Sequence, residues 1–340
     1  DCLWVGWPGT PIPTDDRPAV TRILREEHGA VPVYLSRKQG EEFYLGICNN
    51  TIWPLFHYFY VFATFDAAQW RVYEEANRVF CDEIAAIVRP GDTVWVHDYH
   101  LMLLPAMLRE RFPSLRIGFF LHIPFPAYET FRLFPRTWAR AILEGLLGAD
   151  LIGFHTHDYA QYYLRCVLRM LGMDHTLGTV QLEDRVVRVE TFPMGIDFDR
   201  FAQVAASPAV AEEKEELQAS LQGRQAILSV DRLDYTKGIA NRLEAYEHFL
   251  EEHPEWHDKV TLVAVVVPSR EAVAQYDAMK QRINQLVGYI NGRFGSHSWT
   301  PILYQYKQLS VVPLVAAYAV CDVALVTPLR DGMNLIAKEY

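Results

Sequence analysis

Cysteine is scarce in this sequence, and long apolar runs are missing. Five cysteines occur in 340 residues, an odd number at widely separated positions, which favours a reducing cytoplasm over a disulfide-bonded secreted protein. The sequence contains no run of about 18 apolar residues, and it opens with no basic segment followed by an apolar one. We therefore expect a cytoplasmic protein without a membrane partner.

Basic residues are outnumbered as well. Lysine and arginine total 32 against 42 aspartates and glutamates, and the formal net charge of −10 argues against nucleic acid as a partner. His97, His100 and His122 come nearest to a metal-binding pattern, but their spacing is not that of two ligands on one helix, and no cysteine lies nearby. We expect neither a bound metal nor a cofactor.

The order of the apolar segments is typical of the α/β class. Short β-branched runs alternate with longer segments of helical period, which predicts βαβ units and parallel sheets. The predicted strands are 31–35, 93–97, 116–121, 150–154, 187–192, 226–231, 260–267, 302–306 and 322–327, with a strand-like opening at 3–7. The predicted helices are 70–88, 101–111, 130–147, 158–172, 240–252, 270–290 and 310–320.

Two domains are favoured by the length of 340 residues and the hydrophobic composition of 50%. The segment 192–196 (FPMGI) is the predicted boundary, which gives domains 1–193 and 194–340. We expect two facing Rossmann-like domains with doubly wound parallel sheets. Ligands bind at the carboxyl ends of the strands in such folds, so the chemistry is expected in the cleft between the domains.

Two polar side chains end predicted strands of the first domain. Asp98 follows the strand 93–97, where it is either a functional carboxylate or the N-cap of the next helix. His122 follows the strand 116–121 in a loop that Pro124 and Pro126 hold. A core histidine bonded to the backbone is the alternative for His122.

Three cations end strands of the second domain. Arg232 and Lys237 follow its first strand, where two fixed cations suit a diphosphate leaving group. An exposed pair neutralised by Asp231 and Asp234 is the alternative. Arg270 follows the next strand and suits an acceptor phosphate, because a guanidinium binds phosphate oxygens in pairs.

The segment 331–339 (DGMNLIAKE) is typical of a tight loop after a strand, followed by a helix start. The first backbone N–H groups of a helix lack partners within it and attract anions. Glu339 lies a turn inside, where its carboxylate is placed to accept two hydrogen bonds from a ribose. The alternative is an Asp-Gly turn that leads into a core helix.

Two aromatic residues lie near a segment rich in turn formers, which predicts a loop. Tyr44 and Trp53 flank 49–51 (NNT), where they would wall a sugar pocket and donate an O–H and an N–H to phosphate. Local core packing is the alternative for both.

Six ordered motifs carry a resemblance to a known family. They resemble those of the trehalose-6-phosphate synthases, retaining glycosyltransferases of family 20 with two facing Rossmann-like domains, the GT-B architecture. The match spans nearly the whole chain. The motifs are 6–9 (GWPG), 53–58 (WPLFHY), 97–101 (HDYHL), 118–126 (GFFLHIPFP), 232–238 (RLDYTKG) and 327–335 (TPLRDGMNL).

The resemblance implies a donor site for UDP-glucose in which Arg232 and Lys237 bind the diphosphate and Glu339 binds the ribose. It also implies that Leu309 lies near the uracil, and that His122 and Asp331 face the donor glucose. The rest of the implied donor segment is Gly332, Met333, Asn334, Leu335, Ile336, Ala337 and Lys338.

An acceptor site for glucose 6-phosphate follows from the same resemblance. Tyr44, Trp53 and Arg270 would hold the phosphate, Asp98 would hold the sugar hydroxyls, and Trp7 would close the site. The implied catalytic residues are Asp98, Arg232 and Lys237. A homo-oligomer or a complex with a trehalose-phosphate phosphatase is the implied assembly.

Both ends of the chain are expected to be truncated relative to the family, with the second domain incomplete. The chain opens without methionine and stops at Tyr340 inside a helix. The family begins with a strand that carries an acceptor-phosphate arginine, followed by a Gly-Gly loop to the donor phosphates, and this sequence contains neither.

No carboxylate nucleophile is implied, although retention ordinarily requires one. The resemblance instead implies a reaction on one face of the sugar, with the departing phosphate accepting the proton of the acceptor hydroxyl. Three rivals stay open: a related glucosyltransferase with another phosphorylated acceptor, such as glycerol 3-phosphate, a pseudoglycosidic coupling enzyme, and a catalytically silent regulatory homologue that binds sugar phosphates.

Overall fold

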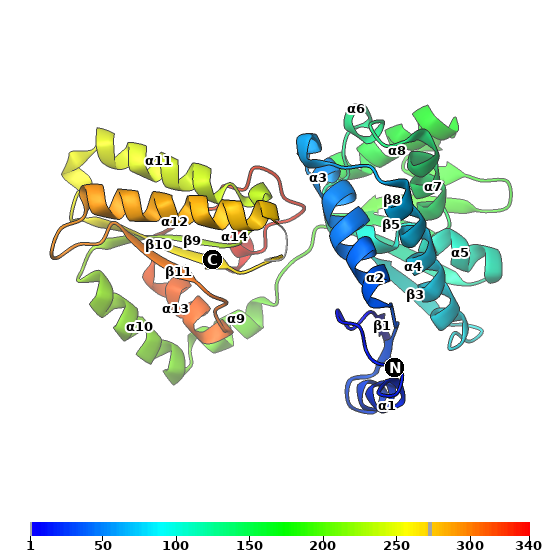
Figure 1. Cartoon of the computed structure of the whole chain (residues 1–340), viewed down its shortest axis with the longest axis horizontal. Helices are drawn as coiled ribbons and strands as arrows, with labels where there is room; N and C mark the ends of the chain where they lie inside the picture. The colour runs from blue at the N-terminus through cyan, green and yellow to red at the C-terminus, as the bar shows by residue number, and fades with distance from the viewer. Residues whose placement is uncertain (1, 271–273) are drawn as a thin grey trace. The chain divides into compact units, whose positions relative to one another are not determined.

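Two compact units make up the chain, which the computed structural model describes at residues 2–270 and 274–340 (Figure 1). The first unit is Asp1–Met194 and the second is Gly195–Tyr340. Each combines helices with a largely parallel sheet, which confirms the predicted α/β class with Rossmann-like units.

The first unit contains a six-stranded sheet of order β3-β4-β5-β8-β7-β6 and a two-stranded parallel sheet, β1-β2. Strands β3, β4, β5 and β8 run parallel, and apolar side chains of neighbouring strands are in register, as at Val96, Phe119 and Ile152. The strands are β1 (Trp4–Gly6), β2 (Ala30–Pro32), β3 (Thr93–His97), β4 (Arg116–Leu121), β5 (Leu151–Phe154), β6 (His175–Thr176), β7 (Thr179–Gln181) and β8 (Val186–Thr191).

One predicted helix of this unit is interrupted. The prediction of a single helix over 130–147 is wrong, because the helix is broken between α6 (Tyr128–Phe131) and α7 (Arg136–Leu146), where Pro135 disfavours helical backbone at Phe134. The helices are α1 (Arg17–His28), α2 (Arg37–Gly40), η1 (Glu41–Ile52), α3 (Trp53–Phe56), η2 (Tyr60–Phe62), α4 (Ala67–Ala85), η3 (Tyr99–Leu101), α5 (Leu104–Arg111), α6 (Tyr128–Phe131), α7 (Arg136–Leu146) and α8 (His157–Leu171).

The second unit is a four-stranded parallel sheet of order β11-β10-β9-β12. Its strands are β9 (Gln225–Arg232), β10 (Val260–Val267), β11 (Ile302–Tyr306) and β12 (Val323–Ala324). The chain moves outward from β9 to β11 and then returns to the other side of β9. The direction of winding therefore reverses between β9 and β12, and the crevice at such a switch point is where ligands bind in this fold class.

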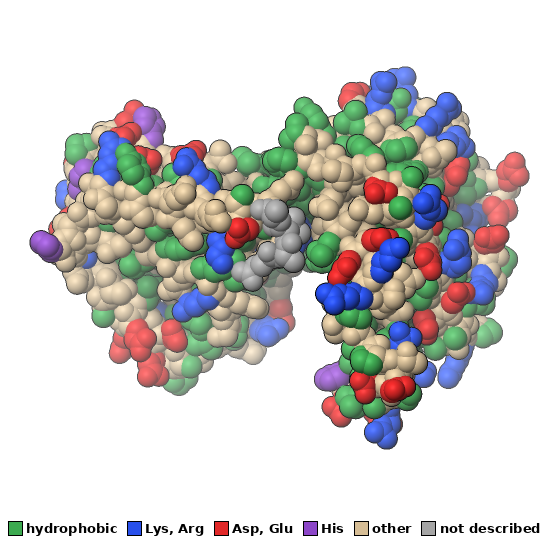
Figure 2. Space-filling view, in the orientation of Figure 1, with side chains coloured by type: hydrophobic (Ala, Val, Ile, Leu, Met, Phe, Trp, Pro, Cys, Tyr) green, Lys and Arg blue, Asp and Glu red, His purple; other side chains and the backbone are tan. Residues whose placement is uncertain are grey.

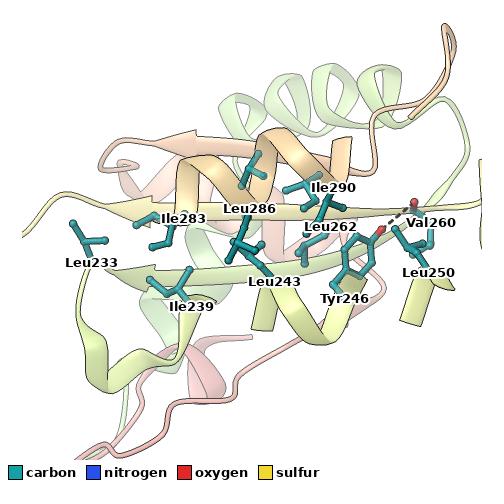
Figure 3. Close-up of a cluster of buried hydrophobic side chains, with 14 of the residues drawn as sticks. Leu233, Ile239, Leu243, Tyr246, Leu250, Val260, Leu262, Ile283, Leu286 and Ile290 are labelled. Atoms are coloured by element: carbon teal, nitrogen blue, oxygen red, sulfur yellow. Dashed lines mark hydrogen bonds between the residues drawn. The ribbon is translucent and has the colours of Figure 1, made fainter. Parts of the chain in front are cut away.

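Helices cover both faces of this second sheet (Figure 1). Along β10, Leu262 and Ala264 pack against α11 and α12, on the face whose apolar cluster Figure 3 draws. Val263 and Val265 pack on the other face against α13. The helices are α9 (Phe198–Ala205), α10 (Pro208–Leu221), η4 (Tyr235–Lys237), α11 (Ile239–Glu252), η5 (Pro254–Trp256), α12 (Ala274–Phe294), α13 (Val311–Val320) and α14 (Ile336–Glu339). Part of the predicted helix 270–290, at 271–273, lies outside the described residues.

The surface carries charges of both signs. Lysine and arginine are interspersed with aspartate and glutamate on the face of each unit that Figure 2 shows. Across residues 2–270 and 274–340, no helix is both long and apolar enough to cross a bilayer.

Candidate functional site

All predicted site residues of the second unit lie at or beyond the carboxyl ends of its four strands. Arg232 ends β9 and Lys237 follows it, Arg270 follows β10, Leu309 follows β11, and the segment 331–339 follows β12. In a parallel sheet these ends share one edge. The fold therefore gathers at one edge residues that are up to about a hundred positions apart in sequence.

Lys237 and Asp331 join the two loops that flank the switch point. The Lys237 ammonium lies 2.5 Å from the Asp331 carboxylate, and the two side chains are only 11% and 20% exposed. Asn334 donates to the same carboxylate at 3.2 Å. The backbone supports this contact, because the amides of Leu329 and Arg330 both donate to the Thr236 carbonyl. The two loops thus form one structure.

Arg232 keeps its charge available to a ligand. Its side chain is exposed, and the guanidinium has no protein partner among the described residues. The alternative in which Asp231 and Asp234 neutralise Arg232 and Lys237 is wrong. Asp231 pairs with Arg242 instead, at 2.7 Å, because successive side chains of a strand point to opposite faces and Asp231 points into the core.

Arg270 is tied to the loop that carries Lys237. Its guanidinium donates to Asp234 at 3.0 Å and to the Tyr276 hydroxyl at 2.6 Å, and that hydroxyl donates to Asp234 at 3.0 Å. Asp234 also accepts from the Thr236 amide at 3.0 Å. Arg270 has a left-handed backbone with φ of 49°, a strained conformation that is often found at functional sites.

A hydrogen bond holds the last part of the segment that follows β12. The Tyr318 hydroxyl of α13 donates to the Glu339 carboxylate at 2.6 Å. Burial and this carboxylate raise the pKa of Tyr318 above its ordinary value. At the start of α14, the Asn334 side chain accepts from the Ala337 amide at 3.2 Å, so one of the amides predicted for an anion already has a partner.

The remaining residues of this segment differ in exposure. Gly332 is buried, Met333 and Leu335 are half-buried, and Ala337 and Lys338 are exposed. Ile336 packs on the same apolar cluster as Leu309, and both lie at its partly buried rim.

In the first unit, the polar side chains gather at the carboxyl ends of β3, β4 and β5. Asp98 has a strained backbone, with φ of 71° and ψ of 173°, and its carboxylate accepts from the His122 amide at 3.1 Å. The His97 and His122 rings meet through Nδ1 and Nε2 at 3.1 Å. His155, which follows β5, lies 5.7 Å from His122 between ring centroids.

Sequence reasoning missed His155, although it follows β5 in the same way that His122 follows β4. Asp98 occupies the N-cap position of η3, but its carboxylate is engaged by His122 on the neighbouring strand end. The N-cap alternative therefore does not account for this side chain.

His122 is held in its neutral form. Burial, reinforced by His97 and His155, lowers the pKa of His122 to about 4. The unfolded chain takes up this proton near the ordinary pKa of about 6.5, so the free energy of unfolding should rise with pH between about 4 and 6.5. An NMR titration of the His122 ring should have its midpoint near 4. A midpoint above about 6 would contradict this account.

Aromatic rings connect the predicted acceptor residues. Between ring centroids, Trp7 lies 6.0 Å from Tyr44, and Tyr44 stacks on His100 at 5.8 Å. The centroid of the Trp53 ring lies 5.7 Å from that of Tyr99. The ring centroids of Tyr99 and His100 are 3.9 Å apart, so the contacts run continuously from Trp7 to Trp53. The buried indole N–H of Trp7 has no acceptor among the described residues, so it can donate to a ligand.

The predicted loop around Tyr44 and Trp53 is wrong. Tyr44 lies within η1, a π-helical segment, and Trp53 begins α3. The turn-forming residues between them are accommodated because their side chains are bonded to other segments. Asn49 accepts from the Tyr99 hydroxyl at 3.2 Å, and the Thr51 hydroxyl donates to the Thr64 carbonyl. Trp53 is only 6% exposed, so little of its ring is available to solvent.

Metal ligands do not converge in the described part of the chain. Over residues 2–270 and 274–340, no group of three or more histidine, cysteine, aspartate or glutamate side chains is arranged to hold a metal ion.

The sequence is similar to that of known proteins. The family model described as glycosyltransferase family 20 matches residues 1–340. A bifunctional trehalose-6-phosphate synthase/phosphatase from Thermoproteus tenax is 48% identical over 340 residues, which cover 100% of this chain and 46% of that protein. The chain thus spans about half the length of this relative.

Solved structures of similar fold have been determined with ligands. An alpha,alpha-trehalose-phosphate synthase (UDP-forming) from Burkholderia xenovorans in complex with glucose-6-phosphate is 31% identical, with a TM-score of 0.89 over 99% of this chain and 81% of that chain. A structure described as trehalose-6-phosphate from E. coli bound with UDP-2-fluoro glucose is 34% identical, with a TM-score of 0.90 over 99% of this chain and 74% of that chain.

Proposed function

Because the chain belongs to glycosyltransferase family 20, as its motifs predicted, we propose that the protein transfers glucose from UDP-glucose to glucose 6-phosphate with retention, giving trehalose 6-phosphate and UDP. The observation that carries the proposal is the pair of cations at the switch point of the second unit. Arg232 is exposed, and Lys237 is buried beside Asp331. Relatives bound to glucose-6-phosphate and to UDP-2-fluoro glucose support the same pair of substrates.

The second unit, in this proposal, binds most of the donor. Arg232 and Lys237 hold the diphosphate, Glu339 holds the ribose, and Leu309 contacts the uracil. Asp331 faces the glucose, as does His122 of the first unit. Lys237 can serve the diphosphate while it stays paired with Asp331, because an ammonium has three N–H donors.

The acceptor residues come mainly from the first unit. Tyr44 and Trp53 bind the phosphate of glucose 6-phosphate together with Arg270, Asp98 accepts hydrogen bonds from the sugar, and Trp7 closes the site. The strained backbone of Asp98 and its bond to the His122 amide support this role, because they fix the carboxylate before substrate binds.

The proposed reaction proceeds on one face of the donor sugar. The bond between C1 of glucose and the phosphate oxygen breaks, and a bond from C1 to the acceptor oxygen forms on the same side. The acceptor hydroxyl gives its proton to the departing phosphate oxygen. Arg232 and Lys237 stabilise the negative charge that develops on the diphosphate, which is commonly the largest contribution in such catalysis.

Replacing Arg270 with alanine should raise the KM for glucose 6-phosphate by roughly tenfold or more and change the KM for UDP-glucose far less, because the guanidinium is assigned to the acceptor phosphate alone. Steady-state kinetics with each substrate varied in turn measures both effects. Tyr276→Phe is the matched control, since it removes a hydrogen bond to Arg270 and keeps the cation. Equal increases in both KM values would assign Arg270 a general structural role.

A panel of acceptors tests the function itself. UDP release from UDP-glucose should depend on glucose 6-phosphate and should be slow with glycerol 3-phosphate or glucose. Faster release with glycerol 3-phosphate would identify the related glucosyltransferase instead. Binding of both substrates without turnover would identify a silent regulatory homologue.

We also propose where the enzyme works and which partner it has. Within residues 2–270 and 274–340 no disulfide joins the cysteines, and four of the five are buried, which supports a location in the reducing cytoplasm. No metal is needed in this mechanism, since the two cations neutralise the diphosphate. The bifunctional synthase/phosphatase of T. tenax supports a phosphatase as the partner that consumes the product.

A further inference from the structure

Arg242 lies directly behind the two loops that carry the proposed donor site. It lies at the end of the first turn of α11, and the residue is only 3% exposed. α11 is anchored on the sheet by the apolar side chains of Ile239, Leu243, Tyr246 and Leu250 (Figure 3). The guanidinium of Arg242 is therefore presented from a fixed position.

Four hydrogen bonds lead from this guanidinium to three different segments. Nη1 donates to the Ser229 hydroxyl at 2.5 Å and to the Asp231 carboxylate at 2.7 Å, both on β9. Nη2 donates to the Lys237 carbonyl at 3.2 Å, in the loop after β9. Nε donates to the Thr327 hydroxyl at 3.0 Å, in the loop after β12. Arg242 thus connects both sides of the switch point to the core of the sheet.

The bonds to the two loops fix the residues that approach the donor. The Lys237 carbonyl belongs to the residue whose ammonium meets Asp331, and Thr327 opens the segment on which Asp331 lies. A guanidinium is planar, with donors in a rigid fork, so bonds from its two sides hold their acceptors at a set separation. A lysine at this position has a single flexible donor group and cannot do the same.

The charge of Arg242 is compensated within the core. Asp231 is its ion-pair partner, and the two side chains are 1% and 5% exposed. This pair therefore adds little net charge at the carboxyl ends of the strands. Arg242 acts there by fixing the positions of the two loops.

We propose that Arg242 is a positioning residue for the donor site, which holds Lys237 and the loop after β12 at the separation that the diphosphate of UDP-glucose requires. It does so without touching the donor. This inference rests on the proposed function, because it assumes that a nucleoside diphosphate binds at this edge.

Two conservative variants separate positioning from simple stability. Thr327→Val removes only the hydroxyl that ties Arg242 to the loop after β12. Ser229→Ala removes a hydrogen bond from the same guanidinium, but one that leads to the strand and not to a loop. Each variant loses one bond of similar kind, so their effects on folding should be similar.

The affinity for UDP, measured by calorimetry, is the main readout. Thr327→Val should weaken UDP binding by about fivefold and raise the KM for UDP-glucose in parallel, while the KM for glucose 6-phosphate changes less than about twofold. Ser229→Ala should leave UDP affinity unchanged. Arg242→Lys should weaken UDP binding by about tenfold or more if it folds, because it cuts both loop contacts.

Several results would overturn the proposal. Equal effects of Thr327→Val and Ser229→Ala on UDP affinity would make Arg242 a purely structural residue. Unchanged UDP affinity in Thr327→Val would show that the loop after β12 is positioned without its hydrogen bond to Arg242. Failure of the unmodified protein to bind UDP would instead refute the proposed function, which keeps the two failures distinct.

Discussion

Replacing Lys237 with alanine is expected to lower turnover by about 100-fold or more, which is the usual cost of losing one fixed donor to the charge that develops in a transition state. The Lys237 side chain is only 11% exposed and its ammonium lies beside Asp331, so the charge is largely buried and interacts strongly with a ligand. UDP release at saturating substrates measures the effect.

The fold should survive this change. Asp331 would keep its hydrogen bonds from the Gly332 amide and from Asn334, so its carboxylate is not left without donors. Lys259→Ala is the matched control, because Lys259 is exposed and lies before β10, at the opposite edge of the sheet. A Lys237→Ala variant that is folded by circular dichroism and turns over at near-normal rate would refute the role of this cation.

Asp98→Asn should reduce transfer by roughly 10- to 100-fold, the usual cost of losing a hydrogen bond to a charged group at a binding site. Asparagine has nearly the same shape as aspartate, so the strain of the backbone at this position, with φ of 71° and ψ of 173°, should change little. Its side-chain oxygen can still accept from the His122 amide, so the loop should keep its conformation. The carboxylate charge facing the sugar is what the variant loses.

The control for Asp98 lies at the other end of the same strand. Asp92 accepts from the Arg89 amide in the turn before β3, so Asp92→Asn tests a local structural carboxylate. We expect Asp92→Asn to keep its activity. Full activity in both variants would show that Asp98 has only a structural role in the turn after β3.

The buried strands were predictable from the sequence because of how parallel sheets are covered. A strand with helices on both faces is apolar on both sides, so β10 is a continuous run and its predicted range of 260–267 is confirmed, as is that of β11. The hairpin β6-β7 was missed, because strands of two or three residues are too short to show a period. β12 was predicted too long, since only Val323 and Ala324 pair with β9.

Strand ends were predictable as well, but the partners of their side chains were not. The sequence placed Asp98, Arg232 and Lys237 at carboxyl ends, because each follows an apolar run. It could not show that Lys237 meets Asp331, 94 positions away, or that Asp231 turns inward to Arg242. Such pairing depends on the winding order of the sheet, which a single sequence does not contain.

Analysis of the reaction product tests the central claim most directly. The protein is incubated with glucose 6-phosphate and UDP-glucose labelled with ¹³C at C1 of the glucose, and the labelled carbon is followed by NMR. The account predicts that the label appears in an α-configured linkage to C1 of glucose 6-phosphate, as trehalose 6-phosphate, while UDP is released in equal amount. A β-configured product, free labelled glucose as the main product, or no transfer by the folded protein would contradict it.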